Sequence, residues 1–387
     1  RLVAGRCHTA SALDSGEQPS VLSAILKDQN TDGMRVAIND AMDVHAGKGV
    51  CRGRSNYLAG VYDTIPVAIT VEGANILTRS MIVFGQGAIR CHPYVLKEMR
   101  AAANPDRSAA LRDFDDALFR HVGFTLSNLA RAFVLGLTGA RLARVPQAAV
   151  GTPYLKQLTR LSSGFAFMAD VAMLSLGGDL KRREKLSGRF ADILSHLYLA
   201  SAVIKHHEDA DRLVAEQPIV EWALQDSLYK IQQAMLGICE NFPVKAVGRI
   251  MRIAVMPLGP RIKPPSDRLG HRVAQVLMQP GEARDRLSSG LYFELDRNDP
   301  VGLTELCLRK VIAAEPIEQK LREATGVAIA PYEFDAAITK GLEQGVINDL
   351  EARTVREAME LTSAVIAVDE FGEHRQQLEG TQPAASA

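Results

Sequence analysis

The clearest hydrophobic pattern in the chain is a row of apolar residues spaced alternately four and three positions apart. The row comprises Leu186, Phe190, Ile193, Leu197, Ala200 and Ile204. This spacing places every member on one face of an α-helix, so we expect a long amphipathic helix that buries this face. A similar row comprises Leu155, Leu158, Leu161, Phe165, Met168 and Ala172. Gly177-Gly178 separates the rows, which predicts two helices folded back on each other as core.

The remaining chain is also predicted to be helical, because the period-two alternation of a half-buried strand is nearly absent. Glycines and a proline between residues 47 and 66 predict an irregular connection, and prolines between 256 and 265 predict a loop. We expect a disordered tail at 380–387. The predicted helices cover 20–27, 33–44, 74–99 with a break at 85–87 or at Pro93, 268–277, 303–325, and 332–368 with a break near Gly345. The predicted fold class is therefore all-α.

Charge and cysteine content exclude several functional classes. Lysine plus arginine and aspartate plus glutamate both number 45, so net charge favours neither nucleic acid nor an acidic partner. The five cysteines are scattered without a C-x-x-C, which argues against disulfides and zinc and fits a reducing compartment. His206-His207 supplies too few ligands for a metal and predicts an exposed helix end; we predict no metal site. No uncharged stretch approaches the ~20 residues of a membrane-spanning helix, so we expect a soluble or peripheral chain.

The tract from Thr70 to Arg79 carries the strongest chemical signal. Its Glu72-Gly73 pair resembles the loop with which acyl-CoA dehydrogenases remove a proton from the α-carbon of a fatty acyl thioester. A carboxylate in an apolar slot suits this task, because desolvation makes it a stronger base near neutral pH. Glycine permits a tight turn close to the ligand. The resemblance makes Glu72 the catalytic base, places Glu72 and Gly73 against the substrate, and aligns Arg79 with a family arginine. We expect Glu72 just before a helix N-terminus.

A second segment, from Asp40 to Val50, is similar to the glycine-rich family segment that contacts the pyrophosphate side of FAD. The resemblance implies that Gly47, Lys48 and Gly49 contact the cofactor through their backbone amides. Gly49 precedes Glu72 by 23 residues, close to the family spacing. Asp43 stands in place of the family glutamine, and its charge would repel a pyrophosphate. Asp43 is therefore not expected to contact FAD.

Two further stretches, from Phe84 to Tyr94 and from Gly177 to Glu184, are similar to one branch of the family. That branch is the bacterial long-form fatty-acyl-CoA dehydrogenase, which carries a helical C-terminal extension. The resemblance runs in ordered patches from about Ser11 to about Phe371. It implies that residues 1–100 are the last part of the dehydrogenase four-helix bundle, that 101–379 are the helical extension, and that 380–387 are the tail.

The same resemblance implies a reaction and its partners. FAD-dependent oxidation would convert a medium- or long-chain fatty acyl-CoA to a trans-2-enoyl-CoA in β-oxidation, and electron-transferring flavoprotein would accept the electrons. An N-terminal domain and a β-domain, which hold most of the flavin, are expected on a longer polypeptide, and the fragment alone is expected to be inactive. We expect a homodimer in the bacterial cytoplasm, with peripheral contact to the inner membrane left open.

Two alternatives come from other functional classes. One is a non-catalytic helical module for docking or dimerisation, which the missing β-domain favours. The other is a peripheral membrane anchor. It is suggested by the stretch from Arg249 to Arg272, where cations alternate with apolar residues as in helices that bind anionic lipid surfaces. Flavin content would distinguish the docking module from the enzyme, and salt-sensitive vesicle binding would identify the anchor.

Overall fold

The computed structural model describes residues 1–53, 55–326 and 334–369, and these residues contain helices and no β-strand. The all-α prediction is therefore confirmed. The chain divides into two compact units. The first comprises residues 1–33 and 66–276, and the second comprises 34–65 and the segment from Leu277 onward. The division falls inside three helices, α2 (Leu22–His45), α4 (Ala59–Thr70) and α13 (Asp267–Met278).

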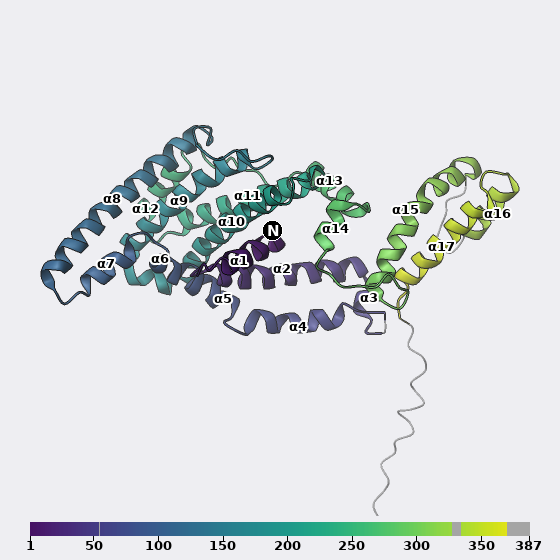
Figure 1. Cartoon of the computed structure of the whole chain (residues 1–387), viewed down its shortest axis with the longest axis horizontal. Helices are drawn as coiled ribbons and strands as arrows, with labels where there is room; N and C mark the ends of the chain where they lie inside the picture. The colour runs from purple at the N-terminus through teal and green to yellow at the C-terminus, as the bar shows by residue number, and fades with distance from the viewer. Residues whose placement is uncertain (54, 327–333, 370–387) are drawn as a thin grey trace, which may run out of the picture. The chain divides into compact units, whose positions relative to one another are not determined.

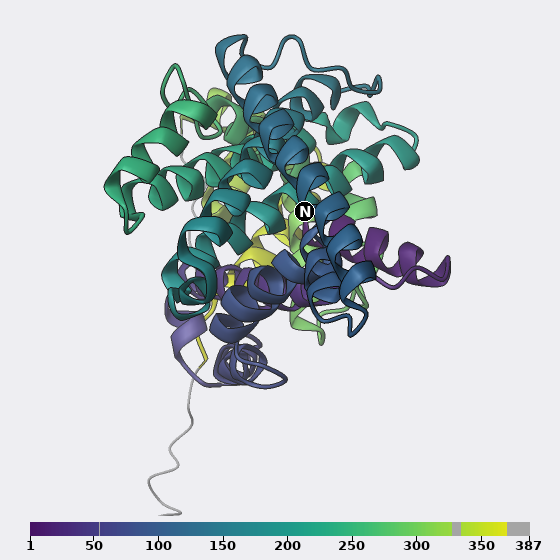
Figure 2. The ribbon, with the colours of Figure 1, turned by 90° about the vertical axis from the view of Figure 1, so that its left-hand side faces the viewer.

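The first unit contains most of the helices (Figure 1). They are α1 (Leu2–Asp14), α5 (Asn75–Leu77), the π-helix η1 (Thr78–Gln86), α6 (Gly87–Arg90), α7 (Val95–Ala102), α8 (Arg107–Leu137), α9 (Thr152–Leu176), the 3-10 helix η2 (Gly177–Arg182), α10 (Glu184–Asp209), the 3-10 helix η3 (Val214–Glu216), α11 (Gln217–Asn241) and α12 (Lys245–Val255). The long helix α8 lies alongside α9 and also contacts α7 (Figure 1 and Figure 2).

Helix α10 forms the centre of this unit. It contacts α11, η1, α1 and α9, and its whole predicted row is buried, as predicted. Phe190 of that row is fully buried and stacks on Phe84 of η1, with ring centroids 4.5 Å apart. Aromatic stacking adds to the burial of both rings. The helix that follows the Glu72 tract is thereby fixed against the core.

The second apolar row also lies where it was predicted. Leu158, Leu161, Met168 and Ala172 of α9 are buried in the same core. Gly177 ends α9 with a left-handed φ of +50°, and η2 leads into α10. The segment Thr152–Arg182 is long and apolar enough to cross a membrane. Its place in the core accounts for this composition, because a central helix is apolar for the same reason.

Helix α2 corrects one prediction. The structure has a single helix where the sequence predicted two, at 20–27 and 33–44. The polar run 28–32 remains helical because its side chains enter a hydrogen-bond network, with Asp28 only 1% exposed. Gly33 is kept within the helix by close packing. A Cβ there would come within 2.7 Å of the Leu2 side chain, which belongs to the unpredicted helix α1.

The connection predicted as irregular between 47 and 66 is a second correction. It contains α3 (Gly47–Val50) and the first half of α4, and Pro66 lies inside α4. The side-chain oxygen of Asn56 accepts hydrogen bonds from the N–H groups of Leu58 and Ala59, which caps the start of α4. Burial of Ile65, 3% exposed, helps to offset the hydrogen bond that Pro66 removes.

The predicted helix over 74–99 is continuous through 85–87 and breaks at 91–94, so the alternative at Pro93 is the correct one. The π-helical stretch η1 replaces α-helical bonding between residues 78 and 86. Helices on both sides of the predicted domain boundary at 100 and 101, such as η1 and α10, pack together in the first unit. The boundary itself remains a prediction.

The second unit contains α3, α14 (Glu282–Ser288), α15 (Pro300–Thr325), α16 (Phe334–Glu343) and α17 (Asp349–Ile366). Helices α15, α16 and α17 share a small core that includes Ala314, Leu321, Ile338 and Val355. The predicted helices near 268–277 and 303–325, the loop at 256–265 and the break near Gly345 are confirmed. The predicted tail at 380–387 and the start of the last helix at Tyr332 lie outside the described residues.

Candidate functional site

The Glu72-Gly73 pair forms a reverse turn between α4 and α5. Helix α4 ends at Thr70, and the chain turns through Glu72 with φ +54° and Gly73 with φ +90°. Glycine adopts this left-handed region freely, whereas glutamate does so at a cost of about 1 kcal/mol. Glu72 is exposed and precedes the first residue of α5, so its predicted position before a helix N-terminus is confirmed.

Lys27 of α2 holds this turn through three hydrogen bonds. Its Nζ donates to the carbonyl oxygen of Gly73 at 2.8 Å and to the side-chain oxygen of Asn75 at 2.5 Å. It also donates to the carbonyl oxygen of Ile69 at 3.3 Å, in the last turn of α4. Carbonyls at a helix C-terminus lack partners inside the helix, so a lysine there is stabilising. One ammonium group thus ties α2 to both sides of the turn.

Asn75 anchors the other side of this arrangement. It is 6% exposed, and its amide nitrogen donates to the hydroxyl of Thr31 at 2.8 Å and to a carboxylate oxygen of Asp32 at 3.0 Å. Asp28, on the same helix, accepts a bond from Gln29, but its second carboxylate oxygen is buried without a partner. Burial raises the pKa of Asp28 to about 6, with a further contribution from the nearby Asp32 charge.

Arg79, seven residues after Glu72, pairs with the core rather than with a ligand. It donates to both carboxylate oxygens of Asp192 on α10. Hydrogen bonding to Asp192 raises the pKa of the Arg79 guanidinium above its ordinary value. Gly188 lies against the same guanidinium, and a Cβ there would come within 3.1 Å of Arg79 Cζ. Arg79 therefore fixes the helix that follows the turn.

Exposed apolar side chains flank Glu72 on both sides of the turn. They are Val67, Val71, Ile76, Leu77 and Met81, each 41–65% exposed. Several exposed large apolar side chains within a short segment favour a binding or interface region. The apolar slot predicted around Glu72 is not formed by the described residues, because the carboxylate is exposed. We call these five exposed apolar side chains, which precede and follow Glu72 in the chain, the apolar wall.

The predicted cofactor contacts Gly47, Lys48 and Gly49 lie on α3 in the second unit. Lys48 is 6% exposed and its Nζ donates to the carbonyl oxygen of Val365. Burial lowers the pKa of this lysine. The N–H of Gly49 donates to Ala46, and a Cβ on Gly49 would come within 3.0 Å of the Met42 carbonyl oxygen. Lys48 and Gly49 thus serve the local fold, and Gly47 alone of the three is exposed. The contacts of these three residues with FAD stay a prediction.

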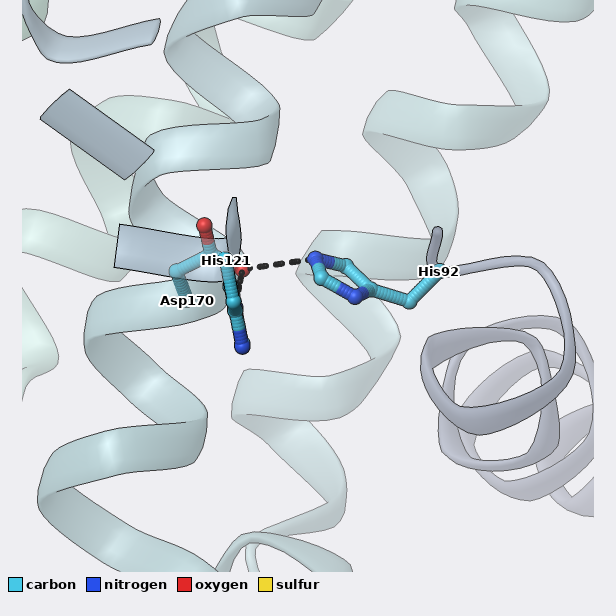
Figure 3. Close-up of side chains that lie close together, drawn as sticks. All are labelled: His92, His121 and Asp170. Carbon is cyan, nitrogen blue, oxygen red and sulfur yellow. Dashed lines mark ion pairs between the residues drawn. The ribbon is translucent and has the colours of Figure 1, made fainter. Parts of the chain in front are cut away.

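A second cluster of chemically capable side chains was not predicted from the sequence. His92, His121 and Asp170 converge from the α6–α7 link, α8 and α9 (Figure 3). His92 Nε2 lies 3.0 Å and His121 Nε2 lies 3.4 Å from the same Asp170 oxygen, Oδ1. These atoms are close enough for a shared metal ion. Neither His92 Nε2 nor Asp170 Oδ1 has a hydrogen bond of good geometry.

The hydrogen bonds around His92 indicate that the histidine N–H groups face the carboxylates, rather than that the ring nitrogens bind a metal ion. His92 Nδ1 accepts from the backbone N–H groups of Tyr94 and Val95, so the proton of the neutral ring must lie on Nε2. A protonated Nε2 has no lone pair for a metal. His121 lies between two carboxylates, Glu98 at 2.8 Å from Nδ1 and Asp170, and a protonated ring can donate to both.

Asp170 completes this network. Its other oxygen accepts from the hydroxyl of Thr125 at 2.6 Å. Burial acts to raise the pKa of Asp170, but the close His92 ring and the hydrogen bond from Thr125 outweigh burial and lower it. His207, predicted at an exposed helix end, is instead 2% exposed, whereas His206 is exposed as predicted. The four-and-three spacing of the apolar row on α10 continues from Ile204 to His207, so the sequence did contain a signal for the burial of His207.

Comparison with known protein families shows which family the chain belongs to. The family described as acyl-CoA dehydrogenase, C-terminal, bacterial type matches residues 89–371, well over half of the sequence. The chain belongs to the acyl-CoA dehydrogenase family. No solved structure matches it. The His92 network of this acyl-CoA dehydrogenase chain lies within the matched region, whereas Glu72 and Gly47–Gly49 precede it. The roles of these four residues therefore depend on the local motifs.

Proposed function

We propose that the chain is the C-terminal portion of an FAD-dependent acyl-CoA dehydrogenase that converts a medium- or long-chain fatty acyl-CoA to a trans-2-enoyl-CoA in β-oxidation. The observation that carries this proposal is the exposed Glu72 on a left-handed turn, with the apolar wall before and after it in the chain. A carboxylate presented in this way can reach the α-carbon of a bound thioester. The wall suits the acyl chain and a covering domain.

In this proposal Glu72 removes the α-proton, and the turn at Gly73 allows the backbone to approach the thioester. Helix α5 begins three residues after Glu72, and the first N–H groups of a helix have no partner within that helix. Hydrogen bonds from such groups stabilise a developing enolate oxygen. FAD, when bound, supplies the hydride acceptor.

The remaining parts of the enzyme follow from the same proposal. The domains that hold most of the flavin precede this chain and cover the apolar wall made by Val67, Val71, Ile76, Leu77 and Met81. Electron-transferring flavoprotein takes the electrons, and the enzyme is a cytoplasmic homodimer. The chain alone is then inactive, because most flavin contacts lie on the preceding domains.

The test is the visible spectrum of the flavin-loaded enzyme during anaerobic addition of palmitoyl-CoA. We expect the wild-type flavin to bleach, and Glu72→Gln to retain its flavin without bleaching. Glu240→Gln, at an exposed glutamate of α11, is the matched control and should bleach normally. Normal bleaching of Glu72→Gln would remove Glu72 as the base. If the purified 387-residue chain binds FAD and palmitoyl-CoA bleaches that flavin, the chain alone contains a complete active site.

A second function, peripheral membrane contact, is favoured by one face of α12. Ile250 and Ile253 are 61% and 62% exposed, and the exposed cations Arg249 and Arg252 stand next to them in the helix. Aliphatic side chains flanked by arginines suit the headgroup region of an anionic leaflet. The short helix would then lie on the surface of the inner membrane.

A further inference from the structure

We propose that Lys27 is a positioning residue that holds Glu72 in its left-handed backbone conformation. This inference rests on the proposed role of Glu72 as the base. Lys27 lies 46 positions from Gly73 in sequence, and no motif in the chain pointed to it. Its function would be to fix the direction in which the Glu72 carboxylate leaves the turn.

Backbone strain is the first step of the argument. Glu72 has φ +54°, a conformation that costs free energy for any residue with a Cβ atom. Strained residues persist only where the surrounding structure holds them, and they cluster at functional sites. Gly73 follows with φ +90°, so two successive left-handed residues reverse the chain. Some group must hold the peptide that follows Glu72.

Lys27 is placed to be that group. Its three acceptors are neutral oxygens, and they come from the end of α4, the turn itself and the first residue of α5. The bond to Gly73 holds the turn, and the bond to Ile69 fixes the helix end that leads into it. Thr78 donates a second hydrogen bond to the Gly73 carbonyl at 3.1 Å. The carbonyl of Gly73 is thereby held from two elements.

Asn75 makes Lys27 a better anchor. The buried amide of Asn75 is fixed by Thr31 and Asp32, and its oxygen accepts the shortest of the Lys27 bonds, at 2.5 Å. An ammonium with one rigid acceptor loses little further freedom when it binds the turn. Lys27 is therefore oriented by the buried Asn75 side chain, and it holds the turn that carries the exposed Glu72.

The first test needs no cofactor and uses the 387-residue chain. A protease that cuts after glutamate can cut at Glu72 only when the turn opens, so its rate reports the open population. We expect Lys27→Met to be cut between Glu72 and Gly73 about tenfold faster than the wild type, as loss of a charge-assisted hydrogen bond implies. Cleavage after Glu17, in the exposed link between α1 and α2, serves as the internal reference.

Two control variants separate positioning from general loosening. Lys27→Arg keeps a cationic donor and should be cut at nearly the wild-type rate. Lys205→Met removes an exposed lysine that pairs with Asp209 on α10, and should leave the Glu72 cut unchanged. If Lys27→Met is cut after Glu72 at the wild-type rate relative to Glu17, Lys27 does not hold the turn and the inference fails.

The second test measures flavin reduction by palmitoyl-CoA in the flavin-loaded enzyme. Lys27→Met should lower the limiting rate at least tenfold with little change in the half-saturating concentration, because a displaced base loses an interaction made in the transition state. Lys27→Arg should recover most of the rate. If Lys27→Met reduces flavin at the wild-type rate while Glu72→Gln is inactive, the positioning role of Lys27 is wrong and the role of Glu72 as the base stands. Normal reduction in Glu72→Gln would overturn the proposed function, and the protease result would then decide the structural role of Lys27.

Discussion

Arg79 and Asp192 form a bidentate ion pair that joins η1 to the central helix α10. Arg79 Nε lies 2.5 Å from one carboxylate oxygen of Asp192, and Nη2 lies 2.5 Å from the other. Because η1 continues directly from the Glu72 turn through α5, this pair sets the position of the segment that follows the candidate base. The absence of a side chain at Gly188, one turn earlier on α10, gives the guanidinium its space.

Loss of this pair should destabilise the first unit. We expect Arg79→Met to lower the free energy of unfolding by about 1–2 kcal/mol, since the pair is bidentate but its side chains remain 38% and 28% exposed. Urea denaturation followed by circular dichroism measures this change. Arg182→Met, at a more exposed pair with Asp179, is the matched control and should give no measurable change. Equal effects of the two variants would contradict the prediction.

The buried carboxyl of Asp28 predicts a stability that falls as pH rises. Its pKa is 3.8 in a free side chain and about 6 in the folded chain. Below pH 3.8 both states hold the proton, between 3.8 and 6 only the folded state does, and above 6 the penalty is complete. Asp28→Asn should therefore be more stable than the wild type at pH 7.5, by up to about 3 kcal/mol.

The measurement for Asp28 is the melting temperature of both proteins between pH 4 and pH 8. The advantage of Asp28→Asn should shrink as pH falls from 6 and vanish near 4. Asp113→Asn, at an exposed position on α8, is the control without such a trend. A pH-independent difference between Asp28→Asn and the wild type would show that the effect comes from packing rather than from proton binding.

The His92 network predicts the opposite pH dependence. The pKa of Asp170 is lowered in the folded chain, so its contribution to stability is present above pH 3.8 and is lost as pH falls below that value. Asp170→Asn should cost about 3 kcal/mol at neutral pH, because it removes one partner of a buried charged network. The difference in unfolding free energy between the wild type and Asp170→Asn should be smaller at acidic pH. Chemical denaturation at pH 7 and pH 3 checks this, and a constant deficit would refute the electrostatic explanation.

The exposed face of α12 predicts salt-sensitive binding to anionic vesicles. We expect the chain to sediment with vesicles containing phosphatidylglycerol at low salt and to be released at high salt, because screening weakens the arginine contacts. Ile253→Glu should abolish binding by placing a charge in the apolar face. Lys340→Glu, on α16 in the other unit, is the matched control and should still bind. Equal binding by both variants would exclude α12 as the contact.

The candidate site shows how far local sequence patterns could lead. The Glu72-Gly73 pair could be proposed from the sequence, because the family motif that it resembles is a short continuous segment. Lys27 could not be found, since its contact with Gly73 spans 46 positions and depends on how α2 packs against the turn. The same holds for His92, His121 and Asp170, which come from three separate elements.

The helical class and the buried faces of α9 and α10 follow from local sequence, because apolar spacing of three and four residues is a property of each segment alone. The break near Gly345 also follows from local backbone chemistry, whereas the sequence left the break in 74–99 open between 85–87 and Pro93 and the structure places it at 91–94. Three features depend instead on tertiary packing: residues 28–32 continue one helix, Pro66 lies inside another, and Arg79 pairs with Asp192. These outcomes depend on hydrogen bonds and burial supplied by distant segments, whose energies outweigh local preference.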